Sequence, residues 1–70
     1  MQISARNQLS GTVAEVVHGA VTTTVKIRLG GDDTITASIT REAAEELALA
    51  EGTAVTAVIK ASDVLVATDA

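Results

Sequence analysis

The stretch VTTTVKIRL at residues 21–29 decides how this sequence folds. Its residues alternate strictly between two sets. The first set is apolar or β-branched and consists of Val21, Thr23, Val25, Ile27 and Leu29. The second set is polar and consists of Thr22, Thr24, Lys26 and Arg28. A period of two places successive side chains on opposite faces of a β-strand. A turn cluster, GGDD at residues 30–33, follows this stretch, and the alternation resumes at residues 34–39. We therefore predict a β-hairpin with one face toward a core.

Three further strands flank the hairpin, at residues 11–17, 53–60 and 63–68, where β-branched and small apolar residues predominate. One short helix is predicted between the third and fourth strands. The order strand, strand, strand, helix, strand, strand is typical of an all-β fold, a five-stranded OB-type Greek-key barrel. Residues 1–70 are therefore expected to form a single domain.

The period changes to that of a helix at residues 41–49. Thr40 is a suitable N-cap, and Glu42 lies close to the positive end of the helix dipole. Ala44, Leu47 and Ala48 form an apolar stripe with helical spacing, and Gly52 is predicted as the C-terminal cap.

The composition favours association between chains. Hydrophobic residues make up 47% of the 70-residue chain, yet it contains no Phe, Tyr, Trp or Cys and one His. Domains of this size have a thin stability margin, and disulfides, structural metals or oligomerisation are their usual supports. Without cysteine, and with a single histidine, the first two supports are excluded. An oligomer is therefore favoured over a lone monomer.

The charge and the termini exclude other partners. A net charge of −4 and the lack of aromatic residues argue against nucleic acid, which requires a basic face and often stacking side chains. Residues 1–10 contain no apolar signal-peptide core, and no apolar run is long enough for a transmembrane helix. We expect no membrane partner and, by default, a cytoplasmic location.

Residues suited to catalysis are scarce. His18 is interpreted as a solvated turn residue, and no cysteine nucleophile exists. The carboxylates of the helix, Glu42, Glu45 and Glu46, are interpreted as a solvated face. The serines have no obvious His and Asp partners, so we expect that the protein is not an enzyme.

Two short segments concentrate hydrogen-bond donors. Ser4-Ala5-Arg6-Asn7 precedes the first barrel strand, and Lys60-Ala61-Ser62 joins the last two. Hydroxyl, amide, guanidinium and ammonium groups lie there beside alanines that let a ligand approach backbone N–H groups. An oxyanion offers only acceptors and requires such surroundings. The alternative is that these are exposed basic residues with loop serines.

Those segments, within residues 3–9 (ISARNQL) and 59–64 (IKASDV), resemble the paired signatures of the molbindin (Mop) family of molybdate-binding proteins. Residues 19–21, 41–47 and 51–52 also fit, so the resemblance covers essentially the whole chain. The length of the GGDD turn and the presence of His18 depart from the family pattern, and neither touches the signatures.

The resemblance implies an OB-like barrel assembled as a hexamer, a trimer of dimers, with oxyanions at subunit interfaces. The ligand would be molybdate or tungstate, with no cofactor and no metal of the protein's own. The residues expected to bind the oxyanion are Ser4, Ala5, Arg6, Asn7, Lys60, Ala61 and Ser62. The residues expected to line a further site, where three chains meet, are Gly19, Ala20 and Val21.

Together these inferences predict a protein for intracellular molybdenum storage or homeostasis. One alternative is a regulatory or protein-interaction module that senses the oxyanion through a partner, since the same domain type occurs attached to transporters and transcription regulators. A nucleic-acid-binding OB domain is disfavoured by the acidity and the missing aromatics.

Overall fold

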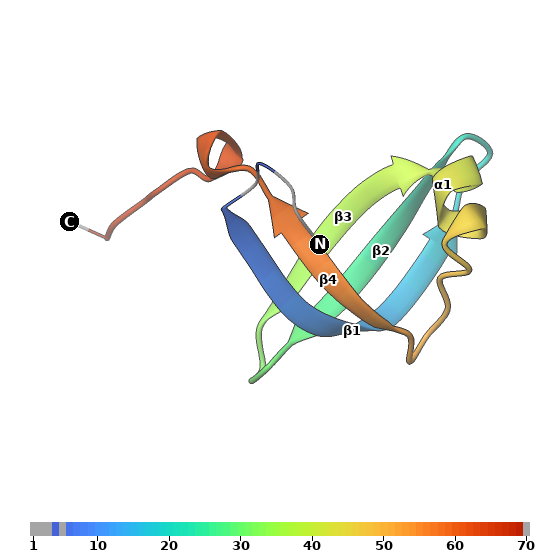
Figure 1. The fold of residues 1–70 in the computed structure, drawn as a ribbon, viewed down its shortest axis with the longest axis horizontal. Coiled ribbons are helices and arrows are strands. Elements are labelled where there is room, and N and C mark those ends of the chain that lie inside the picture. The colour runs from blue at the N-terminus through green and yellow to red at the C-terminus, as the bar shows by residue number, and fades with distance from the viewer. Residues whose placement is uncertain (1–3, 5, 70) are drawn as a thin grey trace.

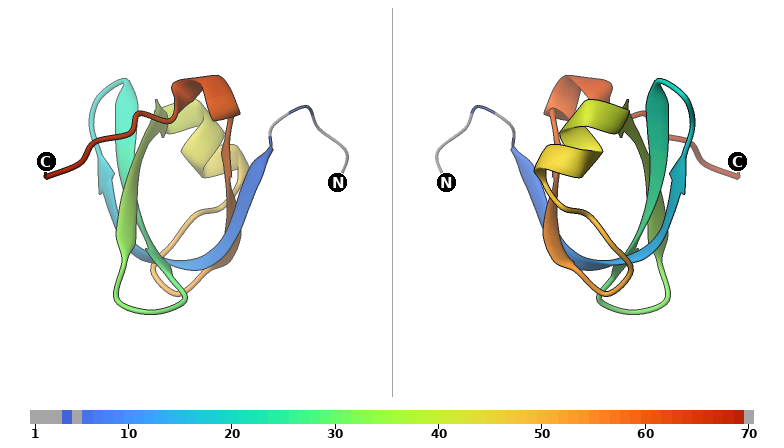
Figure 2. Two further views of the ribbon diagram at one scale, coloured as in Figure 1. Left: turned by 90° about the vertical axis from the view of Figure 1, so that its left-hand side faces the viewer. Right: turned by 90° about the vertical axis from the view of Figure 1, so that its right-hand side faces the viewer.

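One antiparallel sheet forms the body of the protein in the computed structural model, which describes residues 4 and 6–69. Within these residues the elements are β1 (Asn7–His18), β2 (Thr22–Leu29), β3 (Thr34–Thr40), α1 (Arg41–Glu46), β4 (Ala54–Ile59) and a 3₁₀ turn, η1 (Ala61–Asp63). The strand order is β3-β2-β1-β4. The sheet curls into a half-barrel whose open side lies between β3 and β4 (Figures 1 and 2).

The predicted β-hairpin is confirmed. β2 and β3 pair in antiparallel register, with Val25 opposite Ala37 and Ile27 opposite Ile35. Val25 and Ile27 are buried at 2% and 7% exposure, whereas the side chains that alternate with them on β2 are mostly exposed. Val21 was assigned to this strand, but it lies before β2 and is 74% exposed.

β1 is longer than predicted, because it begins at Asn7 rather than at residue 11. It pairs with β2 along one edge and with β4 along the other. A bulge at Ala14 shifts the register between Val13 and Glu15. Because of the extra residue, the inward-facing side chain after Val13 is Val16 rather than Glu15. The bulge bends β1 across the half-barrel, where Val13 packs with Val25, Ile27 and Ala57 as the core.

The N-terminus of α1 forms as predicted, and its C-terminus does not. Thr40 caps the helix, since its Oγ1 accepts a hydrogen bond of 3.0 Å from the Ala43 amide. The helix ends at Glu46 instead of residue 49, and Ala48 adopts a left-handed φ of 51° just beyond it. Gly52 is therefore not the helix cap. Of the predicted apolar stripe, Ala44 is buried at 1%, while Leu47 is 64% exposed.

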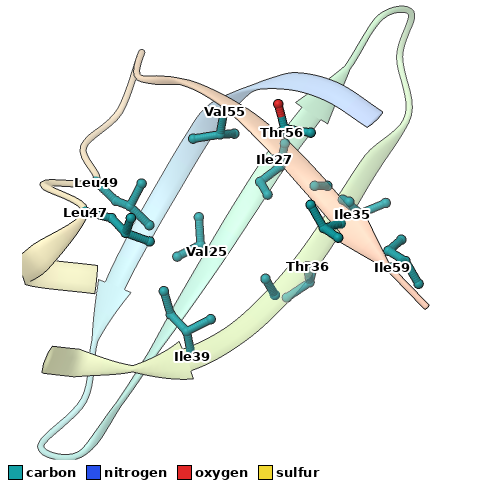
Figure 3. A pocket seen from close by; sticks show the side chains of 13 residues that line it. Val25, Ile27, Ile35, Thr36, Ile39, Leu47, Leu49, Val55, Thr56 and Ile59 are labelled. Carbon is teal, nitrogen blue, oxygen red and sulfur yellow. The ribbon is translucent and has the colours of Figure 1, made fainter. Parts of the chain in front are cut away.

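The fifth strand is wrong for this chain. After η1, residues 64–69 run away from the sheet as an extended tail, and Leu65 and Val66 are 94% and 89% exposed (Figure 1). The predicted five-stranded barrel is therefore a four-stranded half-barrel. Its unclosed side is an apolar groove with a volume of about 320 Å³, lined from β2, β3, β4 and the segment after α1 (Figure 3). No helix in the described part of the chain is long and apolar enough to cross a membrane.

Candidate functional site

The sheet brings the two donor-rich segments together. Asn7, the first residue of β1, lies opposite Ile59, the last residue of β4. Because the two strands are antiparallel neighbours, Arg6, directly before Asn7, and Lys60, directly after Ile59, lie at the same end of the sheet. The Asn7 side chain joins them directly, since its Nδ2 donates to the Ile59 carbonyl at 3.2 Å. We call the described members of these segments, Ser4, Arg6, Asn7, Lys60, Ala61 and Ser62, the donor cluster.

The donor cluster is open to solvent in the single chain. Asn7 is half-buried and its other members are exposed. Within the part of the chain that the structure describes, the ion pairs are Lys26 with Glu15 at 3.7 Å and Arg41 with Glu45 at 3.0 Å. The guanidinium of Arg6 and the ammonium of Lys60 therefore have no acidic partner among those residues, and their charge is available to a ligand. The expectation for Ala5 falls outside the described residues.

Backbone donors add to the donor cluster. In η1 the Asp63 amide donates to the Lys60 carbonyl at 2.9 Å, and the Val64 amide donates to the Ala61 carbonyl at 3.3 Å. The amides of Ala61 and Ser62, which precede these bonds, have no acceptor among the described residues. Within residues 4 and 6–69 the turn thus engages carbonyl oxygens, which would repel an anion, and these two N–H groups donate to no acceptor there. The carboxylate of Asp63 adjoins Ser62 in sequence and is the cluster's acidic neighbour.

The turn at residues 19–21 does not join the donor cluster. It follows His18, the last residue of β1, whereas the donor cluster lies at the strand's first residue (Figure 1). Gly19, Ala20 and Val21 are all exposed. A single chain therefore presents two separate groups of the expected residues, at opposite ends of its longest strand.

Two other kinds of site, for proton transfer and for a metal ion, would need suitable side chains among the described residues. His18 is exposed, and its Nδ1 lies 2.9 Å from Oγ1 of Thr23, a hydrogen bond that the interpretation as a solvated residue did not include. Among the described residues, no three His, Cys, Asp or Glu side chains gather as metal ligands would. Unpaired cations, hydroxyls and free amides form a set that suits an oxyanion.

One contributor was missed in the sequence. The sequence indicates Arg41 only as the first residue of the predicted helix, yet its Nη1 donates to the Gly19 carbonyl at 3.3 Å. Its Nε also donates to Glu45 Oε1 at 3.0 Å, so Glu45 is paired rather than simply solvated. The spacing of four residues between opposite charges on a helix was the available signal for that pair.

Comparison with known proteins shows the family and the fold that the chain shares. Residues 3–66 match the family model described as the TOBE domain. Molybdenum-pterin-binding protein 3 of Clostridium pasteurianum is 47% identical over 66 residues, which cover 94% of this chain and 97% of that protein. A molybdate-binding protein from Sporomusa ovata superposes with a TM-score of 0.91 at 35% identity, covering 97% of this chain and 100% of the other. The cytoplasmic molybdate-binding protein ModG, with molybdate bound, gives 0.89 at 46% identity, covering 93% of this chain and 46% of ModG.

Proposed function

This chain belongs to the TOBE domain family, and on that basis we propose that it binds molybdate, or the similar tungstate, without catalysing a reaction. The observation that carries the proposal is the pairing of Asn7 with Ile59, which unites the two donor-rich segments around Arg6 and Lys60. One guanidinium and one ammonium together balance the charge of a dianion. Hydroxyls and backbone amides supply further donors to its four oxygens.

A site in which donors outnumber acceptors also favours molybdate over phosphate. Molybdate is fully deprotonated at neutral pH, whereas phosphate is partly protonated and needs an acceptor for its proton. A buried polar group left unmatched costs about 1–3 kcal/mol, which is roughly a tenfold to hundredfold preference. Asp63 is the one acidic side chain adjoining the donor cluster in sequence, so this preference requires its carboxylate to face away from the ligand.

The open position of the donor cluster supports a site between subunits. An exposed ion pair contributes about 0.2–1 kcal/mol, so Arg6 and Lys60 in open water would contribute at most about 2 kcal/mol. A Kd of 1 µM requires about 8 kcal/mol. Covering the donor cluster with a second chain removes water, adds donors and strengthens each electrostatic contact. We therefore propose that the oxyanion is bound where chains meet, with Ser4, Arg6, Asn7, Lys60, Ala61 and Ser62 as contacts.

The uncovered apolar surface supports an oligomer independently. The half-barrel leaves an apolar groove of about 320 Å³ open, and the tail exposes Val64, Leu65 and Val66 at 48%, 94% and 89%. Fully burying a Val or Leu side chain stabilises by about 1.5–3 kcal/mol. We propose that the tail packs against a second copy of the chain, within a hexamer built as a trimer of dimers. The turn at residues 19–21 would then line a further oxyanion site where three chains meet.

We place this activity in intracellular molybdenum storage or homeostasis, in the cytoplasm, the location that the description of ModG gives for that relative. The binding itself is an equilibrium between free oxyanion and a preformed set of donors. Such a protein would hold molybdate when it is abundant and release it by mass action when it is scarce.

The test combines the metal content of the protein with its mass in solution. Purified protein is dialysed against molybdate, bound molybdenum is counted per chain by elemental analysis, and the mass is measured by light scattering. We expect bound molybdenum and a mass several times that of the 7.1 kDa chain. A monomer that retains no molybdenum would contradict the proposal. Arg28→Ala is the matched control for Arg6→Ala, because Arg28 is an exposed arginine of β2, in a strand that supplies nothing to the donor cluster.

A further inference from the structure

The turn at residues 19–21 has a tightly constrained beginning. The Gly19 amide donates to the Thr22 carbonyl at 2.7 Å. A Cβ added at Gly19 would lie 2.7 Å from that same carbonyl oxygen, so no residue other than glycine fits without moving the backbone. Just before the turn, His18 is tied to Thr23, which is completely buried. The hairpin itself therefore fixes where the turn starts.

Arg41 ties the turn to α1 at two points. Its backbone amide donates to the Val21 carbonyl at 2.8 Å, and its Nη1 donates to the Gly19 carbonyl at 3.3 Å. The Arg41 guanidinium is oriented in turn by Glu45, one helical turn later, through the 3.0 Å bond to Nε. Among the described residues, Arg41 is the one from outside the β1–β2 hairpin with a hydrogen bond to this turn. The first residue of the helix is thus hydrogen-bonded to the turn through both its backbone and its side chain.

The hydrogen bonds of Arg41 determine which backbone groups of the turn remain available to a ligand. The Gly19 carbonyl and the Ala20 amide belong to one planar peptide unit, in which C=O and N–H point in opposite directions. Holding the carbonyl oxygen toward the Arg41 guanidinium therefore directs the Ala20 N–H away from it. The amides of Ala20 and Val21 have no acceptor within residues 4 and 6–69. The carbonyls at 19 and 21 are engaged and the amides between them are free.

We propose that Arg41 is a positioning residue for oxyanion binding at this turn and that Glu45 fixes Arg41 in that role. The inference rests on the proposed function, since it concerns the further site at residues 19–21. The ligand class is a tetrahedral oxyanion bound through the free amides of Ala20 and Val21. Arg41 acts through the Gly19 peptide, because its Nη1 donates to the Gly19 carbonyl and its Nε donates to Glu45.

Lysine is not an adequate substitute at position 41. A guanidinium donates from Nε and Nη1 in a fixed fork, so one side chain holds the Glu45 carboxylate and the Gly19 carbonyl simultaneously. An ammonium is a point charge on a flexible stem and does not impose that geometry. The backbone bond from residue 41 to Val21 is retained in every variant. Substitution therefore removes the orientation of the Gly19 peptide and leaves the strand ends in place.

The experiment counts molybdate sites by equilibrium dialysis for the wild type, Arg41→Lys, Arg41→Ala and Glu45→Gln, with Glu46→Gln as the matched control. We expect two classes of site in the wild type. Arg41→Ala weakens one class by at least about tenfold, as loss of a hydrogen bond to a charged group does, and retains the other. Arg41→Lys behaves like Arg41→Ala, Glu45→Gln lies between them and the wild type, and Glu46→Gln binds normally. Arg6→Ala loses the class that Arg41→Ala retains.

A second readout makes the test independent of ligand binding. In the apo protein, NMR signals of the Ala20 and Val21 amides should shift or broaden in Arg41→Ala and Arg41→Lys, while those of Gly30 and Gly31 stay unchanged. Unaltered Ala20 and Val21 signals, or two intact classes of site in Arg41→Ala, would overturn the role of Arg41. Wild-type protein that binds no molybdate would refute the proposed function instead, and the NMR comparison would still decide whether Arg41 positions the turn. A purely structural Arg41 would lower the Tm without separating the two classes of site.

Discussion

The loss of molybdate affinity caused by Arg6→Ala shows whether the oxyanion site is covered by a second chain or open to solvent. In the single chain Arg6 is exposed, and it has no acidic partner among the described residues. If the ligand were bound at such an open surface, losing one charge would cost about 0.2–1 kcal/mol, at most about a fivefold rise in Kd. If a second chain covers the site, removing one partner of a buried charged contact costs about 2–5 kcal/mol. That range corresponds to a rise in Kd of about 30-fold to several thousandfold.

Isothermal titration calorimetry with molybdate measures this difference, with Arg28→Ala as the control for removal of an exposed arginine. We expect Arg6→Ala to exceed a 30-fold loss at the affected sites, Lys60→Ala to behave similarly, and Arg28→Ala to bind normally. The apo variants should melt close to the wild type, since Arg6 and Lys60 are exposed in the single chain. A loss below fivefold for both Arg6→Ala and Lys60→Ala would refute a covered site formed by these residues.

Three further substitutions test the fold and the assembly. Gly11→Ala should lower the free energy of unfolding by about 1–3 kcal/mol, because the new Cβ would lie 2.6 Å from Ile27 Cγ2 and 2.7 Å from the Arg28 carbonyl oxygen. Gly30→Ala is the control, because a Cβ there would have nothing within 4 Å. Equal urea midpoints for the two variants would contradict the close approach at Gly11. Thr40→Ala removes the cap of α1 and should cost about 1 kcal/mol in the same measurement, so an unchanged midpoint would show that the cap contributes nothing. Leu65→Asp should reduce the mass in solution by light scattering, and an unaltered oligomer would show that the tail is not at an interface.

The hairpin could be predicted from sequence because its signal is local. Alternation over residues 22–29 and 34–40 depends on each side chain being in or out of the core, which the residue types reveal directly. The bulge at Ala14 could not be predicted, since no glycine or proline marks it and it serves the curvature of the whole sheet. The helix is shorter than predicted for a similar reason. Ala48 adopts a left-handed conformation, which an alanine in the sequence does not indicate.

The strand predicted at residues 63–68 was wrong for a different physical reason. Residues 63–68 have the composition of a strand, but a strand exists only where a neighbour supplies hydrogen-bond partners. Composition does not say whether that neighbour belongs to the same chain. In this structure the sheet ends with β3 and β4, and the tail leaves it with Leu65 and Val66 exposed. The strand-like composition of residues 63–68 is consistent with the proposal that the tail packs against a second copy of the chain.

The candidate site was accessible from sequence as a list of residues and not as an arrangement. Donor chemistry and the family resemblance selected the segments around Arg6 and Lys60, and the antiparallel pairing of β1 with β4 explains why they meet. The role proposed for Arg41 required the structure, because Arg41 lies 22 positions along the chain from Gly19, whose carbonyl it bonds. The alternation within a strand is visible in its own sequence, whereas a contact between two elements is not indicated by the sequence pattern of either element.

A crystal structure of the protein soaked in molybdate, with the molybdenum located by anomalous scattering, tests the central claim most directly. We expect molybdenum beside Arg6 and Lys60, with hydrogen bonds to its oxygens from the Ser4 and Ser62 hydroxyls and from a second chain. Molybdenum bound elsewhere, or contacted at that position by one chain alone, would contradict an oxyanion site formed between subunits.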